Sequence, residues 1–141
     1  MYPYGEKSQA ELDTCHWELQ DLFNEAKKHR NISITCGLRS NEQQAIELEE
    51  GSTKLGPGES KHNSDPSNAV DAIPYPTTAE DWENREYWVE WTSWVKGLAT
   101  GMGIDIVSGF DWDNDYDLDD QSFYDGPHFE RANAQVSEYS G

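Results

Sequence analysis

The apolar residues of this chain alternate between helical and extended spacing, and this order limits the fold more than any other feature of the sequence. Leu12, Leu19 and Phe23 recur at helical spacing, whereas Ile32 and Ile34 alternate with polar residues as in a strand. Helices are predicted for residues 9–28, 41–50 and 79–100, and strands for residues 32–36, 69–73, 104–107 and 127–130. This order predicts an α+β fold in which helices pack on a small antiparallel sheet.

A chain of 141 residues can bury one core but is short for two stable halves. Its low mean hydropathy and high charge, taken alone, are typical of a disordered chain. The 6 Trp, 7 Tyr and 4 Phe residues argue for a packed core instead, because they supply a large apolar area to bury. We therefore expect a single domain over residues 1–141, with its core over about residues 9–131 and short polar tails at both ends.

The chain is strongly acidic, with a formal net charge of −18. Such a charge repels nucleic-acid phosphates and anionic membrane surfaces, so binding to either is not expected. No run approaches the ~18 apolar residues of a membrane span, and the first residues lack the basic and apolar segments of a leader. We expect a soluble product made in the cytoplasm, with no membrane insertion.

The two cysteines, Cys15 and Cys36, form neither a C-x-x-C pair nor a disulfide framework. Buried free thiols are the expected state, although the sequence also permits a bridge between them.

Residues 52–68 are rich in Gly, Ser, Pro and Asn and have no apolar period, which predicts a long surface loop. Loops of this length commonly carry function. His62 lies within this loop, and Asp71 follows on a strand that looks buried, where a carboxylate needs a partner.

His62, Asp71 and His128 make a candidate metal set. A catalytic zinc takes three protein ligands and leaves a fourth position open, and two imidazoles with one carboxylate meet that demand. Taken singly, each histidine is more commonly a surface or core residue. His16 and His29, on a predicted helix, are assigned no metal role.

Three sequence motifs resemble one family of zinc peptidases, which comprises D-alanyl-D-alanine carboxypeptidases, vancomycin-resistance dipeptidases and phage L-alanyl-D-glutamate endolysins. Residues 60–62 and 69–71 (S-K-H and A-V-D) resemble its S-x-H … A-[VF]-D signature, and residues 37–40 (G-L-R-S) its G-x-R-[ST] turn. Residues 125–130 (D-G-P-H-F-E) resemble its closing D-x-x-H-F-E motif. The resemblance covers about residues 12–130 and implies the hedgehog/D,D-peptidase-like fold, with a zinc site on the sheet.

The resemblance also implies roles for individual residues. Zinc would bind to His62, Asp71 and His128. Asp125 would be the general base, and Arg39 would stabilise the oxyanion or bind substrate. Ser60 would contact substrate or order the loop. This chain departs from the family where the loop after His62 is two residues longer than the common form, and where Asp125 replaces the more frequent Glu.

The implied activity is hydrolysis of the stem peptide of bacterial peptidoglycan by a phage endolysin, as an L-alanyl-D-glutamate endopeptidase or a D,D-carboxypeptidase. Such a protein would be made in the host cytoplasm, would reach the cell wall and periplasm through a membrane lesion, and would act as a monomer. The competing hypothesis is a non-catalytic acidic protein that binds calcium or mimics nucleic-acid charge.

Alternating carboxylates follow the third predicted strand, at Asp111, Asp113, Asp115 and Asp117. Oxygen ligands at alternate positions suit calcium. The segment departs from the EF-hand pattern, because it has no Gly at the sixth position and no Glu at the twelfth. A calcium site that orders Asp125 and His128 and a solvated acidic loop both stay open.

Overall fold

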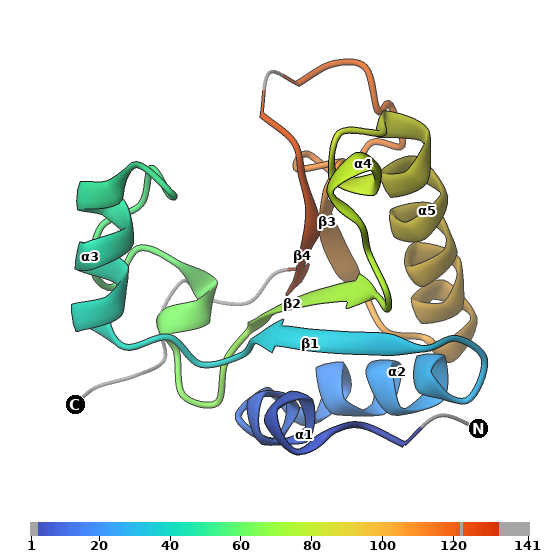
Figure 1. The fold of residues 1–141 in the computed structure, drawn as a ribbon, viewed down its shortest axis with the longest axis horizontal. Coiled ribbons are helices and arrows are strands. Elements are labelled where there is room, and N and C mark those ends of the chain that lie inside the picture. The colour runs from blue at the N-terminus through green and yellow to red at the C-terminus, as the bar shows by residue number, and fades with distance from the viewer. Residues whose placement is uncertain (1–2, 122, 133–141) are drawn as a thin grey trace.

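The computed structural model describes residues 3–121 and 123–132, and it shows an α+β fold (Figure 1). Four antiparallel strands form one sheet in the order β1-β2-β4-β3. The strands are β1 (Ile32–Cys36), β2 (Ala69–Pro74), β3 (Ile106–Gly109) and β4 (Asp125–Arg131). The helices are α1 (Glu6–Asp13), α2 (Trp17–Lys27), α3 (Asn41–Glu50), the 3₁₀ turn η1 (Lys61–Asn63), α4 (Ala79–Trp82) and α5 (Arg85–Met102). No helix in these ranges is long and apolar enough to span a membrane.

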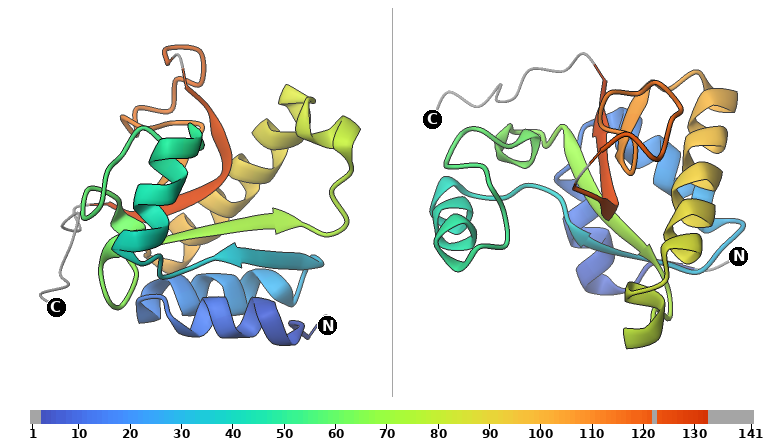
Figure 2. Two further views of the ribbon diagram at one scale, coloured as in Figure 1. Left: turned by 60° about the vertical axis from the view of Figure 1, so that its left-hand side comes forward. Right: turned by 90° about the horizontal axis from the view of Figure 1, so that it is seen from above.

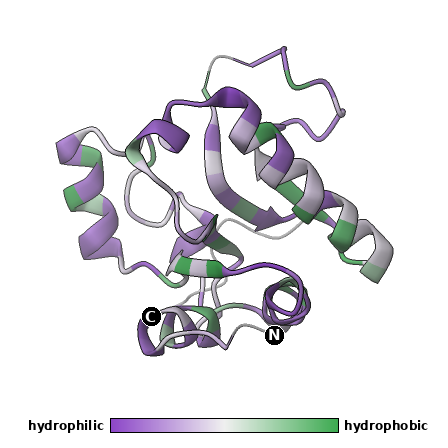
Figure 3. Cartoon of the chain, turned by 45° about the vertical axis from the view of Figure 1, so that its right-hand side comes forward, coloured by the Kyte–Doolittle hydropathy of each residue, from purple (hydrophilic) through white to green (hydrophobic). Residues whose placement is uncertain are grey.

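The core lies between the sheet and the helices α2 and α5. Phe129 of β4 packs against Phe23 of α2 and Trp91 of α5, with ring centroids 5.7 and 6.1 Å apart. The Trp91 indole donates a hydrogen bond to the carbonyl of Ala72 at 3.1 Å. Figure 3 shows the hydrophobic residues of the longest helix gathered in a stripe rather than spread around it, as an amphipathic helix requires.

The other face of the sheet carries the polar residues. Val70 and Ala72 point into the core, so Asp71 between them points the opposite way. Asp71 pairs with His128 across β2 and β4, which brings two of the predicted ligands side by side. Helix α3 stands away from the sheet on this side (Figures 1 and 2).

Two predicted helices are each broken in two. The helix expected over residues 9–28 ends at Asp13. There Cys15 forms an isolated backbone β-bridge with Ser67, and His16 caps the next helix through its Nδ1. The helix expected over residues 79–100 breaks before Arg85, where the Asn84 side chain accepts from the Glu86 N–H and starts α5.

Strand β3 begins two residues later than the predicted 104–107. Gly103 takes a left-handed φ of 74°, and the Ile104 N–H bonds to Ala99, which completes the cap of α5 and delays the strand. Helix α3 agrees with the prediction, with Ser40 as its N-cap and Gly51 at φ 81° as its C-cap. The polar tail predicted after about residue 131 lies, from residue 133 onward, outside the described residues.

A candidate metal centre beside an open cavity

Three segments place the candidate ligands: η1 carries His62, β2 carries Asp71, and β4 carries His128. The turn at His62 is tightly held. Ser60 Oγ accepts from the His62 N–H at 3.1 Å, and the Arg39 N–H bonds to the His62 carbonyl at 2.8 Å. His62 is buried, so the long loop presents it in a fixed position.

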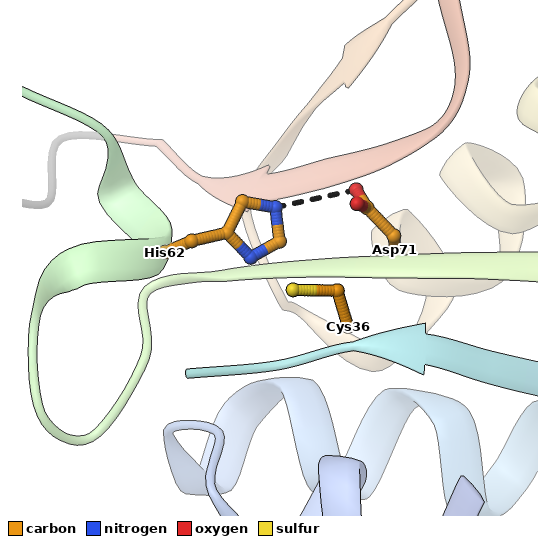
Figure 4. A group of neighbouring side chains, drawn as sticks. All are labelled: Cys36, His62 and Asp71. Atoms are coloured by element: carbon orange, nitrogen blue, oxygen red, sulfur yellow. Dashed lines mark hydrogen bonds and ion pairs between the residues drawn. The ribbon is translucent and has the colours of Figure 1, made fainter. Parts of the chain in front are cut away.

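Both imidazoles point at one oxygen of Asp71. His62 Nε2 lies 3.2 Å from Asp71 Oδ1, and His128 Nδ1 lies 3.3 Å from the same atom. Figure 4 shows the His62 ring directed at the carboxylate.

The opposite nitrogen of each ring fixes its tautomer. His62 Nδ1 lies 2.7 Å from the Gly37 carbonyl, which can only accept, so this nitrogen carries the hydrogen. His128 Nε2 lies 2.8 Å from Glu130 Oε1, and Lys61 holds the other Glu130 oxygen at 2.9 Å. In each ring the nitrogen that faces the Asp71 carboxylate is therefore the one left to bind a proton or a metal ion. Three electron-pair donors facing one another call for a cation between them, and this donor set fits a metal such as zinc.

The pKa values of His62 and Asp71 are shifted by the close approach of these same groups. Burial lowers the pKa of His62, but the Asp71 carboxylate outweighs it and raises the pKa of His62 to about 10. Burial opposes ionisation of Asp71, yet the neighbouring His62 and His128 rings hold its pKa well below the usual range. The site thus keeps Asp71 ionised and attracts positive charge.

Asp125 stands next to this group at the start of β4. It forms, with Asp71 and His128, a set whose ligand atoms all lie within 4.8 Å of one another. Burial first, and then the charge of Asp71, raise the pKa of Asp125. A carboxylate with a raised pKa beside a metal set suits general acid–base work.

Cys36 is a neighbour that the sequence did not single out for the site. Its sulfur groups with His62 and Asp71 within the same 4.8 Å limit (Figure 4). Both cysteines are free thiols, as expected, but Cys36 is half-buried rather than buried. Gly37 follows it where a Cβ would collide with the Glu11 carbonyl, so this strand end must be glycine.

Arg39 reaches the site but is largely occupied. Its Nε lies 2.8 Å from Glu47 Oε2, and its Nη1 donates to Gln44 Oε1 at 3.0 Å. Its Nη2 lies 3.7 Å from Asp71 Oδ2, and only 12 % of the side chain is exposed.

An open cavity of about 640 Å³ borders the candidate ligands, a volume typical of sites for small ligands. Ser60 and Arg39, the two residues that the sequence suggested for substrate binding, line this cavity. Its further walls come from residues that sequence reasoning missed: Glu47, Ser52, Thr53, Lys54, Leu55, Trp112, Asp120, Gln121 and Phe123. Trp112 lies beside the candidate ligands, with its ring centroid 5.1 Å from that of His128.

The acidic segment after β3 brings three of its four predicted calcium ligands together. Oxygen atoms of Asp111, Asp113 and Asp115 lie within 4.8 Å of one another, and Asp117 is not in this set. Asp111 accepts from the N–H groups of residues 115 and 116 at 3.2 and 2.8 Å. Hydrogen bonding with Asp115 is the main cause that raises the pKa of the nearby Asp120 to about 6.

Comparison with known proteins gives a family match and a similar solved structure. The model of a family described as phage L-alanyl-D-glutamate peptidase matches residues 1–132. The crystal structure of the L-Ala D-Glu endopeptidase ChiX from Serratia marcescens is similar, with a TM-score of 0.68 and 25 % identity over 91 % of this chain and 88 % of that one. No protein in the curated set matches the chain.

Proposed function

The chain belongs to the phage L-alanyl-D-glutamate peptidase family, and from this premise we propose that it is a zinc-dependent endopeptidase that cleaves the L-alanyl-D-glutamate bond of the peptidoglycan stem peptide. One observation carries the metal assignment: two histidine ring nitrogens, each left available for a metal by a hydrogen bond on the far side of its ring, face one oxygen of Asp71. Family membership favours this enzyme over a D,D-carboxypeptidase and over a non-catalytic acidic protein.

In the proposed mechanism His62, Asp71 and His128 hold zinc. Bound there, zinc acts as a Lewis acid toward the scissile carbonyl and lowers the pKa of a water molecule to about 7. Asp125 accepts a proton from the attacking water on its carboxylate, and it returns this proton to the amine that leaves. Its raised pKa favours that return.

Arg39 and Ser60 have supporting roles in this proposal. The Nε and Nη1 of Arg39 are bound to Glu47 and Gln44, whereas Nη2, on the Asp71 side, donates only a weak hydrogen bond to the Cys36 sulfur at 3.7 Å, so Nη2 is the atom that would stabilise the oxyanion. The Ser60 oxygen accepts from the His62 N–H and holds the loop, while its hydroxyl hydrogen can reach a substrate in the cavity.

Calcium binding by the acidic segment is a separate proposal. Asp111, Asp113 and Asp115 supply the converging oxygens, and the segment leads through Trp112 to the ring of His128. Calcium at this position would order one wall of the cavity. The carboxylates would otherwise repel one another, as the raised pKa of Asp113, caused first by burial and then by Asp115, indicates.

The substrate of the proposed reaction lies in the cell wall. We therefore propose that the protein, made in the host cytoplasm, acts at the wall or in the periplasm. It works there as a monomer, because one copy supplies every group named above.

Digestion of purified peptidoglycan tests the proposed function. Mass spectrometry of the products should show new amino termini at D-glutamate. Release of D-alanine would instead identify a D,D-carboxypeptidase. The purified protein should carry about one zinc per chain, and a metal-free, inactive protein would refute the proposal.

A further inference from the structure

Lys54 is unusual among the basic residues of this acidic chain. Of the ten, eight bind a carboxylate, an amide oxygen or a backbone carbonyl: Lys27, Lys28, Arg30, Arg39, Lys61, Arg85, Lys96 and Arg131. The remaining two, Lys7 and Lys54, have no hydrogen bond or ion pair with any residue in 3–121 or 123–132. Only Lys54 of these two lines the cavity beside the metal ligands.

A row of rings connects Lys54 to the metal centre. Its ammonium lies 5.7 Å from the centre of the Phe123 ring, within the range of a cation–π contact. Phe123 stacks on Trp112 at 6.0 Å, and Trp112 lies 5.1 Å from the His128 ring. These contacts join the loop that carries Lys54 to the cavity wall that carries Phe123 and Trp112. The exposed ammonium of Lys54 thus lines the cavity.

Arg39, the other cation on this cavity, is less available for an anionic ligand. Glu47 lies 2.8 Å from its Nε, and Asp71 lies 3.7 Å from its Nη2. These two acids already offset the charge of Arg39, so it attracts a substrate carboxylate less strongly than an unpaired cation does. The net charge of −18 also repels an anionic peptide, and an unpaired cation in the cavity wall offsets this repulsion locally.

The substrate of the proposed reaction supplies such an anion. Glutamate has two carboxyl groups, and at most one of them continues the peptide. The other stays close to the cleaved amide as a carboxylate, unless it is amidated. A lysine ammonium binds a carboxylate as a point charge with three hydrogen-bond donors.

We propose that Lys54 binds the free carboxylate of the glutamate and makes the enzyme prefer glutamate to its amidated form. This inference rests on the proposed function and adds a specificity residue to it.

The test uses two synthetic stem peptides that differ only at this group, which is a carboxylate in one and a carboxamide in the other. For the zinc-loaded wild type, kcat/KM should be about 10- to 100-fold higher on the carboxylate peptide, the range of one charged hydrogen bond. Lys54→Met should lose this preference and cleave the two peptides with similar kcat/KM. Lys54→Arg should retain much of it.

Lys7→Met is the matched control. Lys7 also has no ion pair in the described residues, and its replacement by Met changes the net charge by the same amount. It lies on α1, outside the cavity. Equal preference in Lys54→Met and wild type, with zinc bound in both, would overturn the inference. A loss of preference in Lys7→Met of the same size would also overturn it, by showing that overall charge is the cause. If zinc-loaded wild type cleaved neither peptide, the proposed function itself would fail.

Discussion

Replacing Asp125 by asparagine should separate metal binding from turnover. The change keeps the size of the side chain at the start of β4 and removes the basic oxygen. Asp71 would still face both imidazoles, since neither His62 nor His128 depends on Asp125 for a hydrogen bond that fixes its tautomer. Zinc should therefore remain bound at about one per chain in Asp125→Asn.

The expected loss follows from the position of the carboxylate. A carboxylate oxygen of Asp125 lies within 4.8 Å of ligand atoms of Asp71 and His128, close enough to accept a proton from water beside the metal. Loss of a positioned general base lowers kcat by roughly 10²- to 10⁴-fold, or about 2.7–5.4 kcal/mol of transition-state stabilisation. KM should change much less, because Asp125 acts in the transition state.

The thermal stability of the zinc-free protein should not fall with the turnover. Burial raises the pKa of Asp125 in the folded chain, so the ionised carboxylate opposes folding at any pH above that pKa. Asparagine lacks this cost. The zinc-free Asp125→Asn protein should therefore melt at or above the temperature of zinc-free wild type.

The assay combines stopped peptide digests, zinc analysis and thermal melts. Asp119→Asn is the control, because Asp119 is 87 % exposed, pairs with Arg85 and does not line the cavity. Asp125→Glu, which restores a carboxylate, should be more active than the asparagine variant. Turnover within tenfold of wild type in Asp125→Asn would refute the assignment of the base. Loss of zinc would instead make Asp125 a ligand.

Three further predictions concern the metals. Alanine at any one of the three zinc ligands should abolish stoichiometric zinc and activity together, as metal analysis and peptide digests can show; full zinc in all three variants would exclude the site. Glu130→Gln weakens the acceptor that fixes the His128 tautomer, so zinc affinity should fall about 10- to 100-fold in chelator competition; unchanged affinity would leave Glu130 only as a partner of Lys61. Millimolar calcium should raise the melting temperature of wild type but not of the double variant Asp113→Ala with Asp115→Ala; identical titrations would leave a solvated acidic loop.

The fold class and most elements followed from local patterns in the sequence. Strand β1 and helix α3 lie where alternation and the Ser40 cap predicted them. The two helix breaks did not follow, because one depends on pairing of Cys15 with Ser67, which is distant in the chain. The other depends on Asn84, whose capping role is visible only once the helix is known to restart there.

The sequence indicated which residues form the candidate metal centre, but it did not indicate the groups that hold them in place. A motif places His62, Asp71 and His128 in order, and the structure brings them together. The hydrogen bond from His62 to the Gly37 carbonyl has no sequence signal, because any residue offers a carbonyl. The cavity walls at Lys54 and Trp112 come from segments without periodicity, so only the folded chain shows that they face the ligands.

The geometry of the candidate metal centre depends on the core behind it. Each of β2 and β4 alternates between the two faces of the sheet, so the neighbours of the ligands are core residues. Phe129, next to His128, is fully buried against Phe23 and Trp91, and Val70, next to Asp71, is fully buried as well. Because close-packed side chains leave little room for the backbone to shift, Asp71 and His128 hold their register across the two strands. His62 alone comes from a loop, and there the Ser60 and Gly37 hydrogen bonds do what the core does for the strands.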